Sequence, residues 1–157
     1  MTRRRSNRER AKSRREGGPF VPLPISVITS SNYVSLSTKA VKLLVDMCSQ
    51  LHFSAGGPIN NGDISIAWTI LSSRGWKSKE TLRRAELELL YYEFIMQTRQ
   101  GGRNRCNLYA VNWWAIDECG GKLDVMATRT PSCEWKKVKS SYHHGMVQKK
   151  KSLPLKS

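Results

Sequence analysis

The stretch that decides the fold is residues 75–94, which read GWKSKETLRRAELELLYYEF. Cations gather in its first half, and apolar residues recur at spacings of three and four in its second half. That period is typical of an amphipathic helix. Ser78 is a good N-cap, so we expect the helix to begin directly after it. The apolar stripe that should face the core consists of Leu82, Ala85, Leu89 and Tyr92.

A second helix is expected immediately before this one. Asp63 can cap it, and the pattern predicts a helix over residues 64–73. Gly75 suits the position just past a helix C-terminus, which leaves only Trp76 and Lys77 before Ser78. Two helices joined by a short turn that contains glycine form a helix-turn-helix.

The flanking segments supply a third helix and a hairpin. Ser37 offers an N-cap for a helix over residues 38–51, and a short helix is expected over residues 25–29. Residues 94–100 and 106–114 have strand composition. They flank the sequence GGRNR of residues 101–105, which predicts a hairpin with a cationic tip.

The positive charge is concentrated towards the two ends of the chain. The 157 residues include 27 Lys and Arg against 12 Asp and Glu, a formal net charge of +15. Residues 1–16 have eight basic and two acidic side chains, residues 17–118 have ten and eight, and residues 119–157 have nine and two. This balance favours a polyanionic partner such as nucleic acid. We therefore expect a basic, disordered arm over residues 1–18, a folded domain over residues 19–118, and a basic, largely disordered tail over residues 119–157.

Several classes of site find no support in the sequence. The four cysteines form no C-x-x-C pair, which disfavours a structural zinc site. The segment that begins at Asp63 has Arg74 where a calcium loop needs an acid, and no carboxylate spacing suggests a metal nuclease. No run approaches the roughly 20 apolar residues of a membrane span. We expect a non-enzymatic intracellular protein without a cofactor, a metal ion, membrane contact or a small-molecule ligand.

The order of three helices and a cationic hairpin is that of a winged helix-turn-helix, a fold of the α+β class. An α-helix fits the major groove of duplex DNA with its N-terminal residues at the base edges. The hairpin tip, or wing, would reach the backbone or the adjacent minor groove. The candidate DNA-binding residues are Lys77, Ser78, Lys79, Thr81, Arg83 and Arg84 at the helix start, Arg103, Asn104 and Arg105 at the tip, and Arg3, Arg4 and Arg5 in the arm.

Four segments carry a family resemblance: LSTKAVKLLVDMCSQ (residues 36–50), NNGDISIAWTILSSRGWKSKETL (60–82), ELLYYEFIMQTRQGGRNRCNLYAVNWWAIDE (88–118) and GGKLDV (120–125). Together they resemble a group of winged helix-turn-helix DNA-binding proteins from bacterial, phage and mobile-element genomes. The resemblance covers roughly residues 20–125. It implies a role in transcription regulation or in the replication initiation of a mobile element. It also implies a location in the bacterial cytoplasm, associated with the nucleoid. Where members commonly have glycine before the wing, this chain has Tyr92, Glu93 and Phe94.

Two other functions fit parts of the pattern. Basic tails and exposed aromatic side chains also serve RNA binding, although no RNP-like or GXXG signature is present. A winged helix can also act as a protein-interaction module through the same surface. Leu87 and Leu90 lie off the inward stripe and imply a second contact, with the strands, a tail or another subunit. Leu87 and Tyr91, if exposed, would suit a homodimer.

Overall fold

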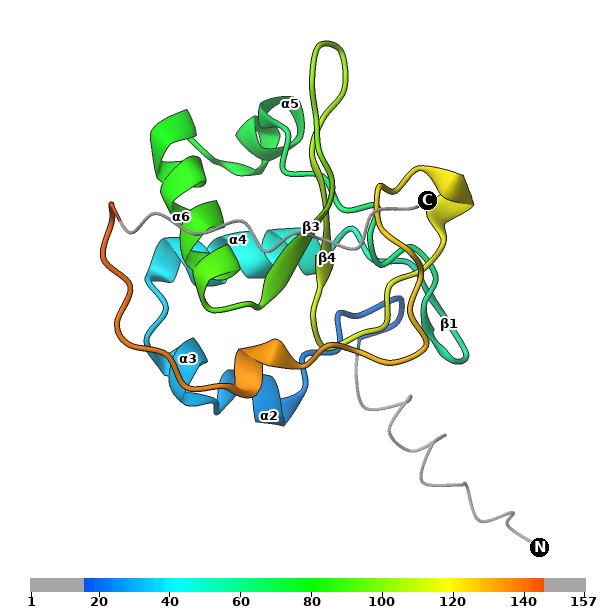
Figure 1. Ribbon diagram of the computed structural model, residues 1–157, viewed down its shortest axis with the longest axis horizontal. Helices are drawn as coiled ribbons and strands as arrows, with labels where there is room; N and C mark the ends of the chain where they lie inside the picture. Colours follow the sequence, from blue (N-terminus) through cyan, green and yellow to red (C-terminus); the bar gives the residue numbers. More distant parts are fainter. Residues whose placement is uncertain (1–15, 146–157) are drawn as a thin grey trace, which may run out of the picture.

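The computed structural model describes residues 16–145, which form a mixed α+β structure with two small antiparallel hairpins (Figure 1). The α-helices are α2 (Ile25–Ile28), α3 (Ser31–Val34), α4 (Thr38–Cys48), α5 (Trp68–Leu71) and α6 (Lys79–Tyr91). The strands are β1 (Phe53–Ser54), β2 (Gly57–Pro58), β3 (Ile95–Arg99) and β4 (Leu108–Val111). Three 3-10 helices complete the order: η1 (Ser72–Arg74), η2 (Cys119–Gly121) and η3 (Glu134–Lys136).

Five α-helices occur within residues 16–145, where the sequence predicted three main helices and one short one. The expected short helix is α2, which follows Pro24. The additional helix is α3, because the side chain of Ser30 accepts a hydrogen bond from the backbone amide of Tyr33 and so caps a second short helix. None of the helices described is both long and apolar enough to cross a membrane.

Helix α4 forms the centre of the core and packs against α6. The side chain of Ser37 accepts from the amide of Ala40, which confirms the predicted N-cap. The apolar side chains of Ala40, Leu44 and Met47 are almost fully buried. On α6, the predicted stripe is also confirmed: its four members are buried, with Leu82 at 6% exposed and Leu89 at 0%.

The predicted helix over residues 64–73 is much shorter in the structure. Ile64 instead forms an antiparallel bridge with Tyr109, in which each amide donates to the other residue's carbonyl, at 3.2 and 2.9 Å. Extended pairing excludes helical geometry at the same residue, so α5 starts only at Trp68. Asp63 is therefore no helix cap, which corrects that prediction; its carboxylate forms an ion pair with Lys122 at 2.6 Å.

Strands β3 and β4 pair in the predicted hairpin, with shorter strands than expected. Ile95 lies opposite Val111 and Gln97 lies opposite Tyr109, and a register irregularity follows before Arg99. Glu93 links α6 to β3 with a φ of 58°. That left-handed conformation suits glycine best, and it occurs at the position where the family resemblance leads us to expect one.

The structure differs most from the sequence-based expectation after residue 118. Residues 119–145 pack on the domain, and Leu123, Val125 and Trp135 are each less than 5% exposed. Asn32 of α3 ties this segment down, because its amide donates to the carbonyls of Trp135 and Lys137 at 2.7 and 2.8 Å. Scattered apolar residues and a distant asparagine stabilise a segment whose local composition suggested disorder. The folded domain thus extends well past residue 118.

Candidate nucleic-acid interface

The turn before α6 is fixed by its own residues. Gly75 adopts a left-handed φ of 85° and ends η1, and the side chain of Ser78 accepts from the amide of Thr81 at 3.2 Å. Both features were predicted from the sequence. Between them, Trp76 is buried at 5% exposure and anchors the turn to the core. The start of α6 therefore has a defined direction relative to η1.

A buried carboxylate on α4 holds this turn in place. Asp46 accepts hydrogen bonds from the Trp76 indole at 2.8 Å, from Arg74 Nε at 2.9 Å and from Lys42 Nζ at 2.6 Å. Burial by itself would raise the pKa of Asp46, but the hydrogen bonds from Lys42, Trp76 and Arg74 outweigh it and lower that pKa. Arg74 therefore forms an ion pair with Asp46, although in the sequence it is one of the cations grouped just before α6.

One face of α6 looks towards the base of the β3–β4 hairpin. Arg83 Nη1 donates to Glu86 Oε1 at 2.7 Å, and the phenol of Tyr109 on β4 donates to the same oxygen at 2.6 Å. Burial, followed by the charge of Glu86, strongly raises the pKa of Tyr109, so the phenol keeps its proton. The hydrogen bond to Glu86 also raises the pKa of Arg83.

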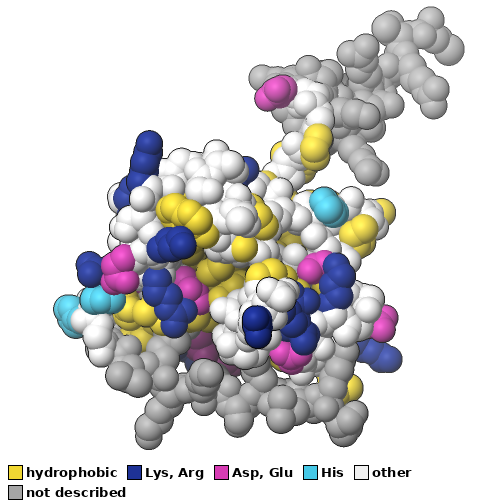
Figure 2. Space-filling model, turned by 90° about the horizontal axis from the view of Figure 1, so that it is seen from above, with side chains coloured by type: hydrophobic (Ala, Val, Ile, Leu, Met, Phe, Trp, Pro, Cys, Tyr) yellow, Lys and Arg dark blue, Asp and Glu magenta, His cyan; other side chains and the backbone are white. Residues whose placement is uncertain are grey.

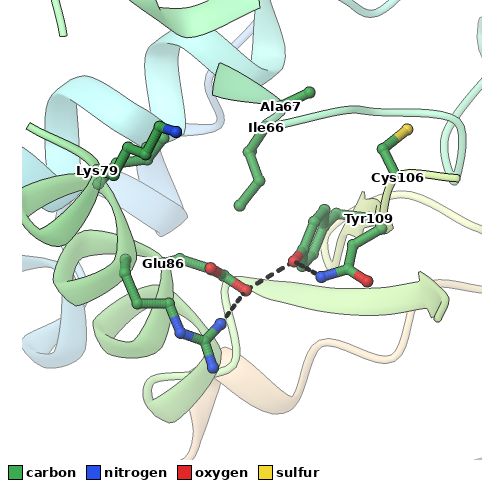
Figure 3. Close-up of a pocket in the computed structure, with 9 residues that line it drawn as sticks. Ile66, Ala67, Lys79, Glu86, Cys106 and Tyr109 are labelled. Carbon is green, nitrogen blue, oxygen red and sulfur yellow. Dashed lines mark hydrogen bonds and ion pairs between the residues drawn. The ribbon is translucent and has the colours of Figure 1, made fainter. Parts of the chain in front are cut away.

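These side chains line a pocket of about 230 Å³ between α6 and β4. Figure 3 shows Lys79 and Glu86 on the α6 side and Cys106 and Tyr109 on the hairpin side. The Arg83 side chain is 54% exposed while Glu86 is 7% exposed, so the guanidinium is held in place yet open to solvent. Lys79 and Arg83 were predicted from the sequence as site residues, whereas Glu86 and Tyr109 were not. The spacing of positions 79, 83 and 86 is the local signal that puts them on one helix face.

The other predicted DNA-binding residues at the start of α6 differ in their contacts with the rest of the protein. Lys77 is exposed, and Thr81 is half-buried at the end of the first turn. Lys79 Nζ lies 5.8 Å from the ring centroid of Trp68, a cation–π contact that leaves the ammonium exposed. Arg84 Nε donates to Glu80 Oε1 at 2.8 Å across one helical turn.

The hairpin tip is a tight turn that exposes its cations. The amide of Gly102 donates to the carbonyl of Arg105 at 2.8 Å, and the reverse bond measures 3.2 Å. Asn104 occupies a left-handed position with a φ of 63°, which asparagine tolerates better than most residues. Arg103 and Arg105 are exposed, and Arg105 Nη2 lies 3.5 Å from Asp124 Oδ1.

The start of α6 and the hairpin tip lie at the same end of the molecule, the upper end in Figure 1. Figure 2 looks onto that end and shows Lys and Arg side chains spread over it, with acidic side chains between them. The structure thus brings the helix-start and tip residues to one face. Arg3, Arg4 and Arg5 lie outside the described residues.

The chemistry of the described residues includes little else that could form a site. Within residues 16–145 no group of three or more His, Cys, Asp or Glu side chains could hold a metal ion. Burial raises the pKa of the Cys48 thiol to about 12 and that of Cys119 to about 11. Both thiols therefore stay protonated at neutral pH and are poor nucleophiles.

Comparison of the chain with models of protein families, with curated proteins and with solved structures finds no match.

Proposed function

We propose that the chain is a winged helix-turn-helix protein that binds duplex DNA. Helix α4, the α5–η1 segment and α6 supply the three helices, and the β3–β4 hairpin supplies the wing; α2 and α3 precede this unit. Support comes from the short turn between η1 and α6, whose direction is fixed by Gly75, Trp76 and the Ser78 cap.

The observation that carries the proposal is the shared position of two cationic elements. The first turn of α6 and the wing tip lie at one end of the molecule, and both have exposed Lys or Arg side chains. An α-helix that enters the major groove presents its N-terminal residues to the bases. The amides of its first turn and its dipole also favour phosphate. The wing can then contact the backbone or the adjacent minor groove.

The contacts within the protein suggest different roles for the cations of α6. Lys77 and Lys79 are exposed and free of carboxylate partners within the described residues, so they are the candidates for base contact. Arg83 is held by Glu86 beside the pocket, and its exposed edge suits a backbone phosphate that passes between α6 and the wing. Ser78 and Thr81 can add hydroxyl contacts to phosphate. Arg103, Asn104 and Arg105 form the contact of the wing.

The arm and tail would add affinity that does not depend on sequence. The arm includes Arg3, Arg4 and Arg5, and phosphate neutralisation by such residues is strongly salt-dependent. The biological role proposed from the family resemblance is transcription regulation or replication initiation of a mobile element, at the bacterial nucleoid. Sequencing of DNA bound in cells tests this role, since one peak at an origin or at the chain's own promoter separates the two alternatives.

Fluorescence anisotropy tests the DNA-binding proposal directly. Titrations against random duplex, single-stranded DNA and structured RNA should show the tightest binding to duplex. Lys77→Ala/Lys79→Ala should weaken duplex binding by about tenfold or more, since two phosphate or base contacts are lost. Lys39→Ala/Arg129→Ala removes the same charge from two exposed positions outside α6 and the hairpin, and serves as the matched control. Equal loss in both pairs, or tighter binding to RNA, would count against the proposal.

A further inference from the structure

Residues 136–145, here called the strap, are attached along the outer side of α6. Lys139 Nζ donates to the carbonyl of Tyr91 at 2.6 Å and forms an ion pair with Glu93 at 3.0 Å. The amide of Tyr142 donates to the phenol oxygen of Tyr92 at 2.9 Å. The ring centroids of Tyr91 and Tyr142 lie 5.4 Å apart. The half-buried Tyr91, which would suit a homodimer if exposed, is therefore covered by the tail of the same chain.

The strap then continues to the opposite end of α6. His144 Nε2 lies 3.8 Å from Glu80 Oε1, in the first turn of the helix. His143 and His144 are both exposed there. Figure 1 shows this segment, coloured orange to red, beside α6. The strap thus runs from the C-terminal end of α6 to its N-terminal end.

The strap and the wing contact different faces of α6. Glu80 and Tyr91 are eleven residues apart, close to three helical turns, so they share one face. Lys79 and Arg83 line the pocket beside the wing. Successive residues are rotated by about 100° around a helix, so Lys79 lies about 100° from Glu80, and Arg83, about 60° from Glu80, borders both the strap and the pocket. A ligand over the start of α6 would have the wing on one flank and the strap on the other.

Glu80 gives the strap a specific electrostatic role. A carboxylate in the first turn of a helix interacts favourably with the helix dipole, but it repels an approaching phosphate. The hydrogen bond from Arg84 lowers the pKa of Glu80, and the nearby His144 lowers it further. The acid therefore stays ionised, with Arg84 and His144 on either side of it. Imidazole N–H groups at this place can donate to a phosphate oxygen whether the ring is neutral or protonated.

We propose that the strap is a third DNA-contacting element, in which His143 and His144 bind backbone phosphates beside the first turn of α6, on the flank away from the wing. This inference rests on the proposed DNA-binding function. The strap also fixes where the chain leaves the described domain, and Lys149, Lys150 and Lys151 follow four to six residues after Gly145.

Histidine acylation by diethyl pyrocarbonate tests the proposal in the full chain without a known target site. The chain has three histidines, and the third is the exposed His52 before β1, which serves as an internal control. Random duplex DNA should protect His143 and His144 from acylation several-fold and leave His52 unprotected. Equal reactivity with and without duplex, under conditions where anisotropy shows the protein bound, would overturn the inference and leave the proposed function intact. An absence of duplex binding would instead overturn the proposed function.

A variant pair separates direct contact from shielding. His143→Ala/His144→Ala should weaken duplex binding by about tenfold, the loss expected when hydrogen bonds to charged groups are removed. His52→Ala should leave the affinity unchanged. Unaltered affinity in the double variant would contradict a phosphate contact. Tighter binding would also contradict it, because the strap would then shield the start of α6 from DNA.

Discussion

The phenol of Tyr109 on β4 and the carboxylate of Glu86 on α6 are joined by a hydrogen bond of 2.6 Å. This bond links the hairpin to the helix at the bottom of the pocket, and Arg83 shares the same carboxylate oxygen. Glu86 and Tyr109 are both almost fully buried, whereas Arg83 is half exposed. The pair therefore fixes both the angle of the hairpin and the position of one cation of the candidate interface.

Tyr109→Phe should lower the free energy of unfolding by about 1–2 kcal/mol, because a buried carboxylate loses a hydrogen-bond donor while the ring packing is kept. Urea denaturation followed by tryptophan fluorescence measures the change. Tyr33→Phe is the matched control, since its edge-on ring contact with Phe94 is available to phenylalanine as well. A loss of the same size in both variants would mean that the bond to Glu86 contributes nothing particular.

The buried Asp46 predicts an acid-dependent stability. Its folded-state pKa is lowered from the ordinary value of 3.8. The stability from its bonds with Lys42, Arg74 and Trp76 is therefore complete above that ordinary value, and it is lost as the pH falls from there through the lowered folded pKa. Asp46→Asn should be less stable at neutral pH and should lose less stability on acidification below pH 4.

Denaturation midpoints measured from pH 7 down to pH 2 test this difference between wild type and Asp46→Asn. Glu80→Gln provides the control, because that carboxylate is exposed and its interactions with Arg84 and His144 are at the surface, where they contribute little stability. Parallel pH profiles for wild type and Asp46→Asn would show that Asp46 is not the group responsible.

Local patterns predicted the parts of the fold that depend on near neighbours. Ser37 and Ser78 cap the helices as expected, Gly75 ends η1, and the apolar stripe of α6 is buried. These features follow from residues three or four positions apart. The bridge between Ile64 and Tyr109 joins residues far apart in sequence, and no local period contains it. The helical pattern was therefore overruled at Ile64 by pairing with β4, and α5 begins only at Trp68.

The candidate site was predictable in its charges and not in its geometry. The cluster at Lys77, Lys79 and Arg83 is visible in the sequence, but composition does not show which cations are engaged by carboxylates. The sequence does not distinguish Glu86 from an ordinary exposed helix residue, because its burial depends on Tyr109 from another element. The packed strap was missed for the same reason, since Asn32 holds it from more than a hundred residues away.

Deleting residues 1–15 should reduce the salt dependence of DNA binding and keep any sequence preference. That segment contains eight Arg and Lys side chains, and each phosphate contact contributes about 0.9 to the slope of log K against log salt concentration. Anisotropy titrations from low to high salt give the slope. Deletion of residues 152–157, which contain one lysine, should change it by less than about 1. If the deletion of residues 1–15 removed the sequence preference and left the slope of log K against log salt concentration unchanged, the arm would not be the source of sequence-independent affinity.

The two glycines at the hairpin tip predict opposite outcomes for the same substitution. A Cβ added at Gly101 would lie 2.6 Å from the carbonyl oxygen of Arg105 and 2.7 Å from the amide nitrogen of Asn107. Both are backbone atoms, so the turn itself would have to shift. At Gly102 a Cβ would meet no atom within 4 Å. Gly101→Ala should therefore lower the free energy of unfolding by about 1–3 kcal/mol, and Gly102→Ala should leave it within about 0.5 kcal/mol of wild type.

The variants Gly101→Ala and Gly102→Ala also test whether the shape of the hairpin tip matters for DNA binding. If Arg103 and Arg105 contact DNA through this turn, distortion of the turn should also weaken duplex affinity in Gly101→Ala, with no change in net charge. Gly102→Ala keeps both the charge and the turn, so its affinity should match wild type. Anisotropy at a temperature where both variants are folded makes the comparison. Wild-type affinity in a folded but destabilised Gly101→Ala would remove the hairpin tip from the DNA interface.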